Sequence, residues 1–319
     1  MITLQKTQDT FKILNLTDPQ LSDAEWEQEA SRILTDTVTA LVRETAPDLI
    51  TVSGDLAWAQ NYISYTKLTE FLDGFGIPWA PVFGNHDCQC GAESLAKAAA
   101  ILTQGQHCLF ESGDPALGNG NYVIGIEQDG RLVHALLMMD SHDKADWTNP
   151  QGENEPQWAQ LIPEQFTWYA EAVDLLTERG AAETTLIMHI PLYTYREALT
   201  AAVAEGVDLT AVPCGKGEQT ACWAPGYADS FGVAYEGIAS YPEDNGFFNL
   251  ILEKGSTKTV LCGHDHVNNF SIHYRGVRLM YSLKTGPGCY WNKQLNGGTL
   301  LTIDNNGHLT AEHHYVAVE

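Results

Sequence analysis

The sequence predicts an α/β protein built as a two-sheet mixed β-sandwich flanked by helices. In the first half of the chain, short apolar runs alternate with helical periodicity about every thirty residues, which is typical of right-handed β-α-β units and a parallel sheet. From Phe270 onward, apolar runs are separated by turns rich in glycine and asparagine, as in antiparallel strands. Because strands of both orientations are expected, we predict two sheets with helices on both sides.

Strands and helices alternate in the first part of the chain. The expected strands are 11–18, 48–55 and 78–83, and the expected helices are 24–46 and 63–75. Each strand is a short apolar run, and each helix carries apolar residues at intervals of three and four. Because right-handed crossovers join such strands in parallel, we expect their carboxyl ends to share one edge of a sheet.

The remaining elements complete the predicted sandwich. We expect strands at 121–128, 133–140, 184–190 and 258–266, helices at 163–179, 193–205 and 245–254, and turns at Arg275-Gly276 and Asn305-Asn306-Gly307. Two segments without period, 141–160 and 213–241, are expected to be loops, and the second is expected to be a functional loop or lid. Because no linker-like segment interrupts residues 1–319, we predict a single domain.

The charge of the chain argues against two classes of partner. Its 319 residues carry a formal net charge of −24, which repels nucleic-acid phosphates and anionic membranes. A small phosphorylated molecule or a phosphoprotein remains compatible, because bound metal ions invert the local field. The N-terminal residues lack a signal-peptide pattern, and no apolar stretch is long enough to span a bilayer. We therefore expect a cytoplasmic protein; removal of a signal peptide would leave the same sequence.

The seven cysteines form no recognisable framework. They are Cys88, Cys90, Cys108, Cys214, Cys222, Cys262 and Cys289. Their odd number and their spacing fit neither a zinc ribbon nor a small disulfide scaffold. Free thiols in a reducing compartment are the favoured interpretation, and a redox or metal role for the Cys88-x-Cys90 pair is the alternative.

Metal-capable side chains recur at, or just beyond, the carboxyl ends of predicted strands. Five clusters have this position: Asp18-Pro-Gln20, Gly54-Asp55, Gly84-Asn-His-Asp87, His189 and Gly263-His-Asp-His266. Ligands of open α/β sheets bind at this edge, so we expect the clusters to converge on one pocket. Carboxylate, amide and imidazole groups together suit borderline metals such as Mn, Fe, Zn, Co or Ni.

The order of these motifs resembles that of the calcineurin-like metallophosphoesterases. The family pattern D-x-H, G-D, G-N-H-[DE], H and G-H-x-H is matched here from Asp18 to His266. The resemblance implies the calcineurin-like fold and two metal ions, divalent or trivalent, with Mn, Fe or Zn as the candidates. It implies that the first ion is held by Asp18, Gln20, Asp55 and His266, and the second by Asp55, Asn85, His189 and His264.

The same resemblance implies catalytic roles for two residues that do not bind metal. His86 would hydrogen-bond the phosphate or protonate the leaving group. Asp87 would hold the His86 ring in place, which is the usual role of a carboxylate beside an imidazole.

Two positions depart from the most common family pattern. Gln20 replaces histidine in the first motif, as in manganese-dependent ADP-ribose/CDP-alcohol pyrophosphatases and in a branch of purple-acid-phosphatase-like protein phosphatases. Trp58 stands where true purple acid phosphatases carry a metal-binding tyrosine. Because tryptophan cannot ligate, we predict no tyrosinate-to-iron charge transfer and no purple colour.

A weaker resemblance concerns the substrate side of the pocket. The segments 263–270 and 281–290 are similar to the C-terminal part of the purple-acid-phosphatase-like branch, which implies that Asn268, Lys284 and Tyr290 lie near the rim. Trp58 and His142 are further candidates for substrate contact. For His142, a role on the surface of a loop is equally compatible.

The function expected from these motifs is phosphate ester hydrolysis. We expect a dinuclear-metal phosphohydrolase that uses a metal-bridging hydroxide for direct attack, without a covalent enzyme intermediate. A nucleotide-type pyrophosphatase or cyclic-nucleotide phosphodiesterase is the alternative enzyme, which Gln20 and the aromatic loop residues favour. A binding scaffold without activity is the alternative of a different class.

Overall fold

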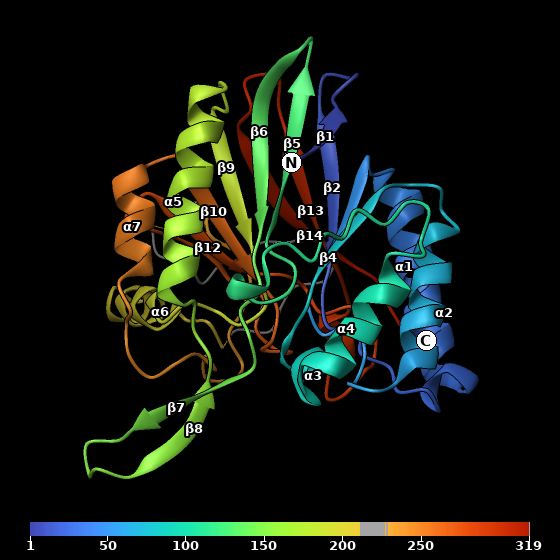
Figure 1. The fold of residues 1–319 in the computed structure, drawn as a ribbon, viewed down its shortest axis with the longest axis horizontal. Helices are drawn as coiled ribbons and strands as arrows, with labels where there is room; N and C mark the ends of the chain where they lie inside the picture. Colours follow the sequence, from blue (N-terminus) through green and yellow to red (C-terminus); the bar gives the residue numbers. More distant parts are fainter. Residues whose placement is uncertain (211–226, 228, 319) are drawn as a thin grey trace.

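Two β-sheets lie face to face in the computed structural model, and helices cover their outer faces (Figure 1). The structure describes residues 1–210, 227 and 229–318. Within these residues the first sheet has seven strands, in the order β1 (Ile2–Gln5), β5 (Tyr122–Gln128), β6 (Arg131–Met138), β9 (Glu183–Ile187), β10 (Thr257–Cys262), β12 (Val277–Tyr281) and β11 (Ser271–Tyr274). The second has five strands in the described residues, in the order β14 (Leu309–Tyr315), β13 (Gly297–Ile303), β2 (Phe11–Leu16), β3 (Leu49–Ser53) and β4 (Trp79–Val82).

The sandwich is mixed, as the sequence predicts. Strands β2, β3 and β4 are parallel, and so are β6, β9, β10 and β12. The pairs β5–β6, β11–β12 and β13–β14 are antiparallel. The carboxyl ends of the parallel strands in both sheets point to one end of the molecule, which sets the position of the functional site.

Helices form two outer layers. The helices α1 (Glu29–Thr45), α2 (Tyr62–Asp73) and α4 (Gly91–Leu102) belong to the side of the second sheet, where α1 contacts β2 and β13. The helices α5 (Pro163–Glu178), α6 (Thr194–Ala204) and α7 (Phe247–Lys254) cover the first sheet. A single turn, α3 (Asn85–Cys88), follows β4 directly. The predicted helix 24–46 is divided: a 3-10 turn, Glu25–Glu27, precedes α1.

Strand β6 shows how the first sheet is buried on both faces. Leu136 and Met138 lie in the core between the sheets, whereas Ala135 and Leu137 lie in the core beneath α5, α6 and α7. Successive side chains of a strand point to opposite faces, so each face of β6 meets its own apolar layer. A strand buried on both faces carries a continuous apolar run, which explains why this segment was visible in the sequence.

Three elements differ from the sequence-based expectation. The segment 141–160, expected to be a loop, contains a hairpin of β7 (Lys144–Thr148) and β8 (Asn154–Trp158) that forms its own two-stranded sheet. Helix α4 and the edge strand β1 were also not expected. Of the expected loop 213–241, residues 213–226 and 228 lie outside the part of the chain that the structure describes. Among the helices described, none combines the length and apolarity needed to cross a bilayer.

Candidate metal centre

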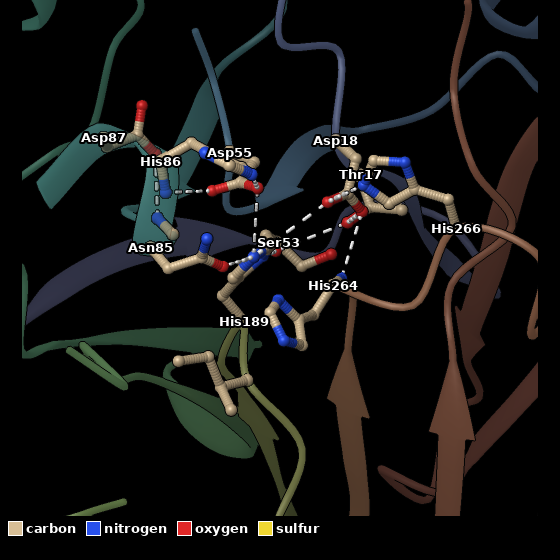
Figure 2. A network of polar contacts seen from close by, with 12 residues as sticks. Thr17, Asp18, Ser53, Asp55, Asn85, His86, Asp87, His189, His264 and His266 are labelled. Atoms are coloured by element: carbon tan, nitrogen blue, oxygen red, sulfur yellow. Dashed lines mark hydrogen bonds and ion pairs between the residues drawn. The ribbon is translucent and has the colours of Figure 1, made fainter. Parts of the chain in front are cut away.

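The predicted metal-capable residues meet where the strands end. Figure 2 shows that Asp18 and Asp55, which follow β2 and β3, face His189 and His266 from the first sheet. The Nε2 atom of His266 lies 3.3 Å from an Asp18 oxygen, and that of His189 lies 3.4 Å from an Asp55 oxygen. Potential ligand atoms of Asp18, Asp55 and His266 all lie within 4.8 Å of one another. The convergence predicted from the sequence is therefore present.

Each central carboxylate has one oxygen held in place and one facing the pocket. The Asp18 Oδ2 atom accepts hydrogen bonds from the Thr17 hydroxyl (2.7 Å) and the His264 backbone N–H (3.2 Å). The Asp55 Oδ1 atom accepts a bond from the His86 backbone N–H at 2.9 Å. The second oxygen of each carboxylate is the one nearest the imidazoles of the pocket. The backbone thus orients both anions before any ligand binds.

The backbone at three of these residues is strained. Asp18, Asp55 and His264 have positive φ values of 54°, 50° and 81°. Residues other than glycine rarely adopt a positive φ. Those that do are concentrated at functional sites, where the surrounding structure enforces the strained conformation. Hydrogen bonds between the two loops contribute here, because the Gln20 N–H donates to the Asp55 carbonyl at 3.1 Å.

Two glycines allow the loops to approach one another. A Cβ atom on Gly84 would lie 2.2 Å from the Asp55 Oδ1 atom, and one on Gly263 would lie 2.0 Å from the Thr17 hydroxyl. Neither position can carry a side chain without moving a residue of the site. The glycines of the G-N-H-D and G-H-D-H motifs are therefore explained by close packing around Asp18 and Asp55.

Hydrogen bonds fix the orientation of two imidazoles. The Nδ1 atom of His189 lies 2.9 Å from the Ser53 carbonyl oxygen, and that of His266 lies 2.7 Å from the Tyr290 carbonyl oxygen. A carbonyl can only accept, so Nδ1 carries the proton in both rings. Nε2 is then the atom that each ring directs at the carboxylates, which is the arrangement of histidine ligands in metal sites.

Several buried polar atoms at this position have no hydrogen-bond partner among the described residues. They are the Asp18 Oδ1 atom, both amide atoms of Gln20, the Asn85 Nδ2 atom and the His264 Nε2 atom. An unpartnered buried polar group is costly, and such groups are rare in folded proteins. Oxygen and imidazole donors together suit borderline metal ions, so the residues present fit the metals that the sequence predicts.

The electrostatics of the pocket keep both carboxylates ionised. Burial alone would raise the pKa of Asp18, but the His266 and His189 side chains hold it well below its usual range. Burial would also raise the pKa of Asp55, but the His189 and His86 side chains together lower it below its usual value. Conversely, burial would lower the pKa of His189, and the two carboxylates raise it to about 10. The centre therefore presents two anions that favour cations.

His86 lies at the open side of this centre. Its side chain is 21% exposed, and its Nε2 atom lies 3.9 Å from Asp55. The Gln89 side-chain amide contacts Nδ1 at 2.7 Å, and the Trp58 ring packs against the imidazole with centroids 4.2 Å apart. If the amide donates to Nδ1, Nε2 carries the proton and directs it into the pocket. Trp58 lies beside His86, and its side chain has no atom that ligates a metal.

Asp87 does not hold His86, contrary to our expectation. Its carboxylate accepts bonds from the backbone N–H groups of Leu56 (3.2 Å), Ala57 (3.2 Å) and Gly84 (2.8 Å), and from the Tyr65 hydroxyl (2.5 Å). These partners occupy both carboxylate oxygens. Asp87 therefore joins the loop after β3 to the loop after β4, and Gln89 is the residue that contacts the His86 ring.

Tyr290 and Asn268 were both expected near the rim of the pocket. The Tyr290 ring stacks on His266 with centroids 4.2 Å apart, and its hydroxyl donates to Glu236 at 2.9 Å. Tyr290 is 47% exposed, so a position at the rim is correct for it. Asn268 is buried, and its side-chain oxygen accepts bonds from the Tyr235 and Glu236 backbone N–H groups. Asn268 therefore organises a loop and does not lie at the rim.

Lys284 is also not at the rim. It is only 2% exposed, and its ammonium group donates to the Asp18 carbonyl oxygen at 2.6 Å. Burial lowers its pKa to about 8, although the nearby Asp18 opposes that shift. A buried cation below Asp18 offsets part of the negative charge of the centre.

His142 lies in a separate polar network. Its Nε2 atom is 3.0 Å from the Gln165 side-chain oxygen, and its backbone N–H donates to Asp140 at 2.8 Å. The ring is partly exposed.

Several supporting residues were not identified from the sequence. The Ser53 carbonyl has no sequence signal, because any residue supplies one. Gln89, three residues after His86 in a helical turn, was detectable from its spacing. Trp158 packs against His264 with ring centroids 4.4 Å apart, and it was missed because its hairpin was not predicted.

With the geometry established, comparison with known proteins decides the family. A family model described as "Calcineurin-like phosphoesterase" matches residues 11–268. The chain belongs to the calcineurin-like phosphoesterase family. The match spans every predicted metal ligand from Asp18 to His266 and agrees with the mixed sandwich described above.

Relatives of this calcineurin-like phosphoesterase include proteins named as purple acid phosphatases. "Probable inactive purple acid phosphatase 29" from Arabidopsis thaliana is 40% identical over 274 residues, which cover 79% of this chain and 63% of the relative. "Probable inactive purple acid phosphatase 14" from the same plant is 24% identical over 313 residues, covering 86% and 70%. "Phosphatase DCR2" from Saccharomyces cerevisiae is 25% identical over 296 residues, covering 84% of this chain and 46% of the yeast protein.

A solved structure supports the fold. A dimetal phosphatase from Danio rerio has a TM-score of 0.58 at 12% identity, covering 96% of this chain and 97% of that chain. The predicted calcineurin-like phosphoesterase fold is thereby confirmed.

Proposed function

We propose that this calcineurin-like phosphoesterase is an active phosphohydrolase that cleaves phosphate esters with the help of two bound metal ions. The observation that carries the proposal is a set of buried ligand atoms without hydrogen-bond partners, which follow strands of both sheets: the Asp18 Oδ1, Gln20 Oε1 and His264 Nε2 atoms. Such a set is costly in a folded protein unless a cation satisfies it. The expected substrates are phosphorylated small molecules or phosphoproteins.

The ligands divide into two groups that share one carboxylate. Asp18, Gln20, Asp55 and His266 would hold one ion, and Asp55, Asn85, His189 and His264 would hold the other. Bound metal ions supply an activated water and offset the charge of the phosphate, and Mn, Fe and Zn all suit these donors. Asp55 is the natural shared residue, because it lies between His189 and His86.

His86 is the residue placed to move a proton. Its ring is partly exposed beside Asp55, and contact with Gln89 leaves Nε2 directed at the pocket. From this position it donates a hydrogen bond to a phosphate oxygen or a proton to the leaving group. The Trp58 ring restricts its rotation and excludes water from one face.

The names of the plant relatives make activity a question to be tested for this chain. Two of the relatives carry the word "inactive" in their names, whereas the yeast relative is named a phosphatase. This chain retains His86 and a side chain with ligand atoms at each of the seven expected metal positions. An intact set of this kind favours catalysis over a binding scaffold.

The test combines metal analysis with turnover. Metal-reconstituted protein is expected to contain about two metal ions per chain and to hydrolyse p-nitrophenyl phosphate. Asp55→Asn is expected to lose both properties. The matched control is Asp129→Asn, which removes the same charge from the exposed turn between β5 and β6, at the end of these strands away from the site. This variant should retain both metal binding and turnover. A metal-loaded wild-type protein without turnover would favour the scaffold.

A second substrate class deserves a parallel assay. Gln20 and the aromatic residue beside His86, Trp58, favour a nucleotide-type pyrophosphatase or a cyclic-nucleotide phosphodiesterase, because aromatic faces can stack on bases. Turnover of ADP-ribose or of bis-p-nitrophenyl phosphate above that of p-nitrophenyl phosphate would select this alternative.

A further inference from the structure

The β7–β8 hairpin extends away from the sandwich (Figure 1), and the last residue of β8, Trp158, packs against His264. The Ala159 N–H donates to the Asp143 carbonyl at 2.9 Å and closes the base of the hairpin. Farther out, the Trp147 indole N–H donates to Glu243 at 3.0 Å, and the Tyr241 hydroxyl donates to the Asp146 carbonyl at 3.2 Å. These bonds fix the hairpin relative to the body of the protein.

One aromatic residue connects this base to a predicted metal ligand. Trp158, the last residue of β8, meets the His264 ring edge to face, with centroids 4.4 Å apart and an interplanar angle of 84°. The ammonium group of Lys144, the first residue of β7, lies 2.9 Å from the centroid of the Trp158 ring. A lysine cation and a metal-ligating imidazole thus contact the same indole.

Lys144 is a cation without an ion-pair partner. It is exposed and forms no salt bridge with any residue in the described part of the chain. Its neighbour Asp143 influences it electrostatically, but no contact within ion-pair distance joins the two side chains. The other lysine at the centre, Lys284, is buried and bonded to the Asp18 carbonyl. Of the two described lysines beside the centre, Lys144 is therefore the one that remains available to a ligand.

The position of this cation indicates what it would bind. The bound metal ions would neutralise the scissile phosphate, so a further positive charge beside them matches a further negative charge on the substrate. Because the ammonium covers one face of Trp158, that face is not open to a stacking base. The indole instead holds the ammonium in position and reduces the entropy that a free lysine would lose on binding.

We propose that Lys144, held by Trp158, binds a second anionic group of the substrate, a carboxylate or a phosphate close to the scissile phosphate ester. This inference rests on the proposed phosphohydrolase function and narrows its substrate class to phosphate esters that carry another negative charge. With a net charge of −24, the rest of the protein surface repels such substrates. A single lysine beside the centre therefore contributes more to the binding of an anionic group than it would on a neutral surface.

The test measures binding of non-hydrolysable probes to the metal-loaded protein by calorimetry. The probes are phenylphosphonate, its 3- and 4-carboxy derivatives, and the benzene bisphosphonates, so that the carboxylate and phosphate forms of the second anion are separate arms. The better doubly anionic probe is expected to bind about fivefold more tightly than phenylphosphonate, as for a partly exposed charge pair. The Lys144→Gln variant should abolish this preference, and Lys144→Arg should retain most of it.

The control and the contradicting outcomes are specific. Lys258→Gln removes an exposed lysine near the amino end of β10, at the opposite end of that strand from the site, and should retain the wild-type preference. A wild-type protein that binds all the probes equally, or a preference that survives Lys144→Gln, overturns the proposal. Failure of every probe to bind also overturns it, and turnover of p-nitrophenyl phosphate by the same preparation then shows whether the phosphohydrolase function fails as well.

Discussion

At the scale of single residues, the absence of a side chain at Gly84 is as important to the centre as the ligands themselves. Its Cα faces Asp55, and an added Cβ would lie 2.2 Å from the carboxylate and 2.4 Å from the Asp55 backbone nitrogen. We expect Gly84→Ala to weaken metal binding by about tenfold or more, because the shared carboxylate must move. Titration of the metal-free protein with Mn²⁺ measures this effect. Gly237→Ala, where nothing lies within 4 Å of the added Cβ, is the control.

Gln20 gives a second prediction at this scale. Both atoms of its buried amide lack a partner among the described residues, so a role as a metal ligand is the explanation we propose. Imidazole is a softer donor than a carboxamide oxygen and favours zinc over manganese. Gln20→His is therefore expected to raise the ratio of bound zinc to manganese about tenfold when the protein is loaded from an equimolar mixture. An unchanged ratio in elemental analysis would show that residue 20 is not a ligand.

The site residues that directly follow buried strands could be identified from the sequence. Asp18, Asp55 and His189 lie where buried strands terminate, and the periodicity of those strands was visible in the sequence. The roles of Asp87 and Lys284 were not predictable, because their partners are the Tyr65 hydroxyl and the Asp18 backbone carbonyl. Tertiary partners of this kind leave no local pattern.

At the scale of elements, the β7–β8 hairpin is separate from both large sheets and is linked to the rest of the protein by side-chain contacts. It forms a two-stranded sheet that pairs with neither large sheet in the described residues. Its tip is organised internally, because the Asn149 side chain bonds to Gln151, Glu153 and Glu155. The cores of the molecule do not include it.

Shortening this hairpin should therefore leave the fold intact. We expect replacement of residues 146–156 by Asn-Gly, a two-residue turn that keeps Lys144 and Trp158, to change the melting temperature by only a few degrees. Circular dichroism melting measures the outcome. A loss of cooperative unfolding would show that the hairpin is part of the folding unit.

Sequence patterns predicted the elements with strong periods and missed those with weak ones. Strands β2, β3 and β9 are rich in aliphatic and β-branched residues, so they were identified. The strands of the hairpin alternate charged, polar and proline residues, with Pro156 inside β8, and proline argues against a strand. Helix α4 was not predicted, although its alanine-rich sequence favours a helix.

At the scale of the whole molecule, the metal centre joins the two sheets. Asp18, Asp55 and Asn85 come from the second sheet, whereas His189 and His264 come from the first. Removal of the metal ions by a chelator is expected to lower the free energy of unfolding by about 3 kcal/mol at a metal concentration near 100 times the dissociation constant. Urea unfolding with and without chelator measures this change. Asp55→Asn should be insensitive to the chelator.

The pH dependence of stability is a second property of the whole molecule. Burial lowers the pKa of His134 to about 4 and that of His313 to about 4, compared with 6.5 in the unfolded chain. The neutral rings bridge the sheets, since His134 contacts the Gly307 carbonyl (2.8 Å) and His313 the Asn269 carbonyl (2.7 Å). The unfolded chain takes up protons below pH 6.5 while the folded rings stay neutral, so this stability is lost as the pH falls toward 4.

We expect each histidine to reduce the free energy of unfolding by about 2 kcal/mol between pH 7 and pH 5. The stability difference between wild type and His134→Gln should therefore shrink by that amount over this interval. Chemical denaturation of the metal-free proteins at both pH values measures it. A difference that is constant with pH would contradict the depressed pKa of His134.

The separation of the ligands along the chain also has a consequence for protein synthesis. Asp18 precedes the first helix, and His266 follows β10, so a ribosome must translate most of the message before the two can meet. Domains generally begin to fold from the N-terminal side during translation. The early ligands therefore remain without their imidazole partners until the later strands emerge. A nascent chain that stops before β10 lacks His264 and His266, so the proposed metal centre would be incomplete in truncated products.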